Sequence, residues 1–179
     1  MKKIIKFALL VVAFMVVVAC GAKNKTVNIT KDGTVYEYAN VSFTYPNSFK
    51  KQDATLYNDA EALSDHIKTI FTKDQEEITL MIDPVIENNK VEELIQLFRV
   101  EVETTGATII SNAKVTLTNG DSCYEIVAEN GDVKAKYMVI FEGGDRYCLK
   151  YKTTTKKYDD KIINMDKFLY TFAVKEQGE

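Results

Sequence analysis

The one histidine in the sequence is the first residue to test for catalytic chemistry. His66 directly follows Asp65, and with a cysteine nucleophile the two could supply the acid–base part of a nucleophilic site. Adjacent residues of a strand point to opposite faces, however, so Asp65 would not orient His66. The sequence also has no Gly-x-Ser-x-Gly motif and no glycine-rich phosphate loop. We therefore predict no catalytic residues and expect that the protein is not an enzyme.

Metal and cofactor sites are equally weakly indicated. Asp59, Glu61 and Asp65 lie close together, but no glycine-turned calcium loop surrounds them. A single histidine and two widely separated cysteines make a poor zinc set. We predict no metal ion and no cofactor.

A haem carrier is the remaining ligand alternative, because methionine, histidine and tyrosine can all ligate haem iron. Met81, Met138 and Met165 are available for this role together with His66. The same methionines, and the many tyrosines and phenylalanines, equally suit a packed core. A carrier would need a real apolar cavity between sheet and helices.

Cys123 and Cys148 could form a disulfide in an exported protein. If Asn130–Gly131 and Gly143–Gly144 are two-residue turns, Cys123 faces Met138 and Cys148 faces Val139. The two thiols would then lie on opposite faces of the sheet and two strands apart, beyond disulfide reach. We predict two unpaired, mostly buried thiols.

A basic stretch late in the chain suggests a binding surface. Its cations alternate with tyrosines, and Arg146, Lys150 and Lys152 share a parity, so they can line one face of a strand. Such a surface suits an anionic polymer such as extracellular DNA or a wall polymer. The simpler alternative is a solvated edge strand protected by lysines. The candidate binding residues are Arg146, Tyr147, Lys150, Tyr151, Lys152, Lys156 and Lys157.

The first twenty residues predict where the protein is located. Lys2, Lys3 and Lys6 precede an apolar run from Phe7 to Ala19, a length typical of an export signal. Cys20 directly follows small residues, as in a lipobox, so we expect cleavage between Ala19 and Cys20 and a lipid on Cys20. Two or more acyl chains anchor a protein stably. Loss of 1–19 shifts the net charge from −3 to −6, which disfavours a dedicated nucleic-acid binder. We expect a lipid-anchored protein on the cell membrane, facing outside the cytoplasm.

Hydrophobic patterning predicts a single α+β domain: an antiparallel sheet with helices packed on it. Short alternating runs predict strands, and several are apolar on both faces, as in a sheet covered on both sides. One apolar stripe predicts a helix over 90–105, started by Asn89 with Glu92 and ended by Gly106. Asp32–Gly33 is interpreted as a hairpin turn. The predicted strands are 35–38, 41–45, 67–72, 78–82 and several within 107–153, and a last helix covers 156–172.

The segment from Tyr38 to Phe49, an alternating aromatic strand ending in Tyr45–Pro46, resembles the opening of PsbP-like domains. The order that follows is similar too: hairpin, long amphipathic helix, β-meander and a terminal helix with Phe172 near its end. The resemblance covers residues 34–173 and implies an αβα sandwich used for protein association. Members range from photosystem extrinsic subunits to a nuclear-transport factor and many bacterial lipoproteins, so this fold does not specify one function.

These observations predict three segments: a signal peptide (1–19), a lipidated N-terminus and tether (20–33) and one PsbP-like domain (34–179). The expected function is a non-enzymatic extracytoplasmic binding module with an unidentified protein partner. The alternatives are anionic-polymer binding through the basic stretch and a small-ligand carrier.

Overall fold

The computed structural model describes residues 28–53, 67–85 and 89–175. The expected signal peptide and its cleavage site at Ala19 and Cys20 lie outside these residues, as does His66. Within the described residues, no helix is both long and apolar enough to cross a membrane.

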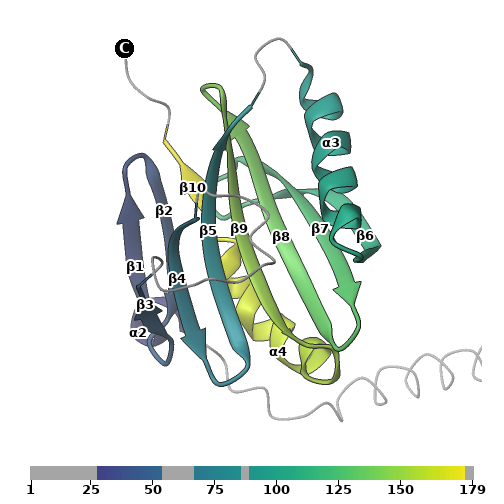
Figure 1. The fold of residues 1–179 in the computed structure, drawn as a ribbon. Coiled ribbons are helices and arrows are strands. Elements are labelled where there is room, and N and C mark those ends of the chain that lie inside the picture. The colour runs from purple at the N-terminus through teal and green to yellow at the C-terminus, as the bar shows by residue number, and fades with distance from the viewer. Residues whose placement is uncertain (1–27, 54–66, 86–88, 176–179) are drawn as a thin grey trace, which may run out of the picture.

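A seven-stranded antiparallel sheet forms the middle layer, with strand order β3-β4-β5-β9-β8-β7-β6. Helix α3 (Val91–Thr104) lies over one face, and α4 (Thr155–Leu169) lies over the opposite face (Figure 1). A smaller sheet, β1-β2-β10, packs on the same side as α4. The strands of the large sheet are β3 (Lys50–Gln52), β4 (Ile67–Lys73), β5 (Glu76–Pro84), β6 (Thr108–Thr116), β7 (Ser122–Asn130), β8 (Val133–Glu142) and β9 (Asp145–Thr154); those of the small sheet are β1 (Gly33–Tyr38), β2 (Val41–Pro46) and β10 (Ala173–Val174).

The sheet separates two hydrophobic clusters. Met138 on β8 points into the cluster beneath α4, whereas its neighbours Tyr137 and Val139 point into the cluster beneath α3. Burial on both faces explains why β8 is apolar along most of its length rather than alternating. The predicted α+β architecture, with a sheet covered on both sides, is confirmed.

Helix α3 begins one residue later than the predicted capping pair of Asn89 and Glu92. Its N-cap is Lys90, whose backbone N–H donates to the Glu93 carboxylate at 3.3 Å. The shift places Glu93 at the third helical position, where its side chain can reach back to the cap. Gly106 follows the helix with φ 84°, so its predicted role as the terminator is confirmed.

The interpretation of Asp32–Gly33 as a hairpin turn was wrong. Asp32 ends the short helix α2 (Ile29–Asp32), which Asn28 caps by accepting from the Thr30 N–H at 3.2 Å. A short helix therefore lies within the segment predicted as tether. Gly33 begins β1, and the turn to β2 comes at Ala39 and Asn40. Close packing explains this glycine: a Cβ there would lie 2.5 Å from Thr44 Cγ2 and 2.8 Å from Phe168 Cε1.

The turn between β7 and β8 differs from the predicted one by one residue. Asn130 pairs with Val133, so the two-residue turn is Gly131–Asp132, and Glu125 rather than Cys123 faces Met138. Shifting the turn by one residue moves the pairing by two. Because an even shift keeps every side chain on its own face, Cys123 stays on the predicted side. The second predicted pair, Cys148 with Val139, is confirmed.

Candidate functional site

The basic stretch does not form one mixed surface of lysines and tyrosines. Tyr147 and Tyr151 belong to the cluster beneath α4 and are 1% and 0% exposed. Arg146, Lys150 and Lys152 share the opposite face of β9, as their parity predicted. The alternation that suggested an aromatic platform thus places tyrosines and cations on different sides of the sheet.

Several of these cations have partners within the fold. Arg146 pairs with Asp83 at 2.8 Å and with Glu101 on α3, and its guanidinium lies 4.6 Å from the centre of the Phe98 ring. These contacts fasten α3 to the middle of the sheet. Lys152 forms an ion pair with Glu77 at 3.3 Å, and Lys157 donates to Gln75 at 2.9 Å. The Lys150 ammonium lies 5.6 Å from the centre of the Tyr137 ring. Lys156 is exposed on the first turn of α4.

Both thiols are free and buried, as predicted. They lie in different clusters, Cys123 beneath α4 and Cys148 beneath α3, so the sheet separates them. Burial raises the pKa of each thiol to about 12. Each is therefore protonated at neutral pH, a state that does not act as a nucleophile.

The three methionines considered as haem ligands are core residues. Met138 and Met165 lie in the cluster beneath α4, whereas Met81 lies in the cluster beneath α3. The sheet between them prevents all three from lining one pocket. In the described parts of the chain, no three His, Cys, Asp or Glu side chains gather as a metal site. Asp59, Glu61 and Asp65 lie outside those parts.

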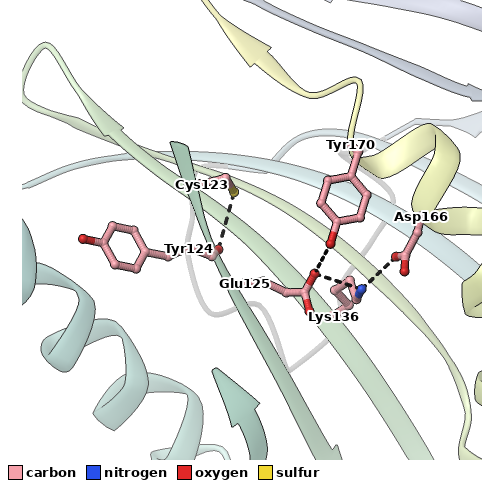
Figure 2. Close-up of polar contacts among 6 residues, drawn as sticks. All are labelled: Cys123, Tyr124, Glu125, Lys136, Asp166 and Tyr170. Carbon is pink, nitrogen blue, oxygen red and sulfur yellow. Dashed lines mark hydrogen bonds and ion pairs between the residues drawn. The ribbon is translucent and has the colours of Figure 1, made fainter. Parts of the chain in front are cut away.

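Sequence reasoning missed a buried ionic network on the α4 side of the sheet, which Figure 2 shows. Lys136 on β8 places its ammonium 3.0 Å from Glu125 on β7 and 2.7 Å from Asp166 on α4. The Tyr170 hydroxyl donates to the same Glu125 carboxylate at 2.9 Å. The Lys136 side chain is 6% exposed. The one available signal was a lysine two residues before Met138, on the same core-facing side of a mostly apolar strand.

In this network the positive charge of the Lys136 ammonium balances the negative charges of the Glu125 and Asp166 carboxylates. Burial raises the pKa of Asp166, and the ion pair with Lys136 opposes that rise. Burial also raises the pKa of Tyr170, helped by its hydrogen bond to Glu125. Lys136 thus binds two carboxylates from different elements. We interpret the network as a device that fastens α4 to β7 and β8.

Tyr170 extends this connection to the edge of the sheet. It is the C-cap residue of α4, and its backbone carbonyl accepts from both the N–H and the hydroxyl of Thr118, at 2.9 and 3.0 Å. Thr118 lies in the turn between β6 and β7. Tyr170 therefore connects the end of α4 with the buried network and with the turn that follows β6.

Strand β6 is the long open edge of the large sheet. It pairs only with β7 within the described chain, and all of its residues are exposed or half-buried. Ile110 is 54% exposed and lies at an irregularity in the pairing, between Ile109 and Ser111. Lys114 is its one charged residue. The opposite edge strand, β3, is much shorter (Figure 1).

Comparisons with known proteins identify the fold. No family model matches the chain, and no curated protein is significantly similar in sequence. Cyanobacterial PsbP (CyanoP) from Synechocystis superposes with a TM-score of 0.61 at 14% identity, over 87% of this chain and 99% of that one. PA94 of Pseudomonas aeruginosa, of unknown function, gives 0.54 at 11% identity over 81% and 99%. The Ran-binding protein Mog1p of Saccharomyces cerevisiae gives 0.51 at 10% identity over 80% and 96%. The described chain therefore has a PsbP-like fold, as the strand ending in Tyr45–Pro46 suggested.

Proposed function

We propose that this protein is a lipid-anchored, extracytoplasmic interaction module without enzymatic activity. Its binding surface is the β6 edge, defined as Thr108–Thr116, and its partner is a protein that adds an extended segment to that edge. The observation that carries the proposal is the length and exposure of β6 on an otherwise covered sheet.

An open edge presents backbone N–H and C=O groups that another strand can pair with. Natural proteins usually blunt such edges by shortening them, charging them or covering them. The β3 edge follows this rule with its three residues, two of them lysines. The β6 edge has nine residues, and its central stretch from Ile110 to Ala113 carries no charge. This contrast supports β6 as the place where a partner binds.

The rigid support behind the edge is a second supporting feature. The Lys136 network and the Tyr170–Thr118 hydrogen bonds connect the β6–β7 hairpin to α4. A preformed edge loses little conformational freedom when a partner segment pairs with it. Most of the conformational entropy lost on binding is then lost by the partner segment.

The start of the described chain and the proposed edge lie at opposite ends of the large sheet. The described chain starts at Asn28 and α2, which lies beside the β3 end of the large sheet (Figure 1). Strand β6 is six strand spacings away, or about 29 Å at ~4.8 Å per spacing. A lipid on Cys20 would hold the α2 side near the membrane and leave the β6 edge accessible to proteins in the surroundings.

Substitutions on the edge test the proposal. Ile110→Asp with Ala113→Asp places two charges on the β6 edge, whereas Ile163→Asp on α4 is a matched control, since Ile163 is 57% exposed. A photoreactive amino acid at Asn112 should crosslink a defined protein in intact cells. The edge variant should abolish that crosslink, and the control should keep it. Equal crosslinking in both variants would contradict the β6 proposal.

The anchor is tested separately. Replacing Cys20 by Ser removes the proposed lipid attachment. The amount of protein in the membrane fraction should therefore fall, and the protein should not incorporate a radiolabelled fatty acid. Continued labelling of the Cys20→Ser protein would contradict anchoring at this residue.

A further inference from the structure

A cleft of about 450 Å³ lies on the α4 side of the molecule, remote from the β6 edge. Its walls are the loop that follows β2, the turn between β4 and β5, and the flank of α4. Its apolar lining includes Pro46 and three residues of the core cluster, Phe49, Met165 and Phe168. A volume in this range is typical of small-molecule sites.

Two lysines line the same cleft, Lys73 from the end of β4 and Lys161 from α4. The Lys161 ammonium lies 3.2 Å from Glu76, a carboxylate that is 6% exposed and that also accepts from the Tyr151 hydroxyl at 2.9 Å. Glu76 therefore holds Lys161 in place at the wall. Lys73 pairs with Glu76 through the strand register, but its ammonium forms no ion pair with any described residue, which leaves its charge available to a ligand.

The remaining polar groups are largely occupied by the fold. Asn47 accepts from Thr34 and donates to the Lys31 carbonyl, and one Asp32 oxygen accepts from the Asn28 N–H. Asn164 accepts from Lys167 at 3.4 Å, so its amide N–H groups can still donate into the cleft.

We propose that this cleft binds a soluble amphipathic anion, meaning a small molecule with an apolar aryl or acyl body and a carboxylate or phosphate at one end. The body would lie over Phe49, Met165 and Phe168, and the anionic end would bind Lys73 with help from the Asn164 amide. Lys73 determines the direction of binding, because of the two lysines in the cleft it is the one without an ion pair among the described residues. This site is independent of the β6 edge.

The test uses the full chain in phosphatidylcholine nanodiscs and 2-naphthyl phosphate as the probe, measured by titration calorimetry. Binding should saturate at one site per chain. Lys73→Gln should weaken it about 10-fold, the loss expected for one charge-assisted hydrogen bond. Lys51→Gln, a lysine on β3 that does not line the cleft, is the matched control and should bind like the parent. The uncharged 2-naphthol should also bind at least about 10-fold more weakly.

A second variant tests the location without removing a charge. Asn164→Trp fills the cleft from α4 and should abolish binding while circular dichroism stays unchanged. The proposal is overturned if the probe does not bind saturably, if Lys51→Gln loses as much affinity as Lys73→Gln, or if a folded Asn164→Trp protein binds normally. If the probe binds in phosphatidylcholine nanodiscs but not in phosphatidylglycerol nanodiscs, the anionic lipid headgroup occupies the cleft. That result would also overturn the assignment to a soluble ligand.

Discussion

Replacing Lys136 by Met should destabilise the protein much more than replacing its neighbour on the same strand, Lys134. Lys136→Met keeps most of the side-chain volume but removes the cation that binds Glu125 and Asp166, whose side chains are 16% and 29% exposed. Removing one partner of a buried ion pair costs about 3–5 kcal/mol. Because Asp166 is partly hydrated, we expect a loss near the lower limit, about 3 kcal/mol in the free energy of unfolding.

Lys134→Met is the matched control. Lys134 pairs with Asp159 at 3.0 Å, but the Asp159 side chain is 84% exposed, and such surface pairs contribute about 0–1 kcal/mol. Thermal unfolding should separate the two variants. With about 2–4 °C per kcal/mol for a chain of this size, Lys136→Met should lower the melting temperature by about 6–12 °C, and Lys134→Met by at most a few degrees.

The Lys136→Met deficit should also depend on pH. Without the ammonium, nothing opposes the burial that raises the folded-state pKa of Asp166, so this carboxyl binds a proton more readily in the folded than in the unfolded chain. The stability lost through the variant is then largest near pH 7, and it decreases as the pH falls toward the unfolded pKa of an aspartate, near 4. Equal losses for Lys134→Met and Lys136→Met, or a Lys136→Met loss that is the same at pH 4 and pH 7, would refute this reasoning.

Three further predictions concern other parts of the fold. Gly33→Ala should lower the free energy of unfolding by about 1–3 kcal/mol, because its Cβ would lie 2.7 Å from the Ile29 carbonyl; an unchanged urea midpoint would contradict the packing role of this glycine. Cys123 and Cys148 should resist iodoacetamide at pH 8 until the protein is unfolded, since burial raises the pKa of both thiols to about 12; labelling of the folded protein would show otherwise. Glu101→Gln should loosen α3 by weakening its ion pair with Arg146 on β9, and faster amide exchange in α3 would detect this; exchange as slow as in the parent would argue against it.

The strands and helices could be predicted because their apolar periodicity is local. The stripe on α3 and the turn glycines at 131 and 143–144 were sufficient for element type and order. Gly33 was misread because its role is tertiary: what requires a glycine is the approach of Thr44 and Phe168, which are distant in sequence. The β7–β8 turn was placed one residue off because Asn–Gly and Gly–Asp are both good turn pairs.

The candidate sites were harder to predict, for a different reason. The alternation along β9 correctly placed Arg146, Lys150 and Lys152 on one face, but no local pattern shows that α4 covers the tyrosines on the other. The Lys136 network joins β7, β8 and α4, whose order in space depends on the whole topology. The openness of β6 is likewise a property of the sheet order, which a single strand does not reveal.

Amide hydrogen exchange on the complex with the crosslinked partner tests the central claim most directly. If a partner segment adds to the sheet at β6, the outward-pointing amides between Thr108 and Thr116 should exchange more slowly in the complex, because strand pairing protects backbone N–H groups. The α4 residues around Ile163 should not change. Protection that appears elsewhere while β6 exchanges at its free rate would contradict the claim that this edge binds the partner.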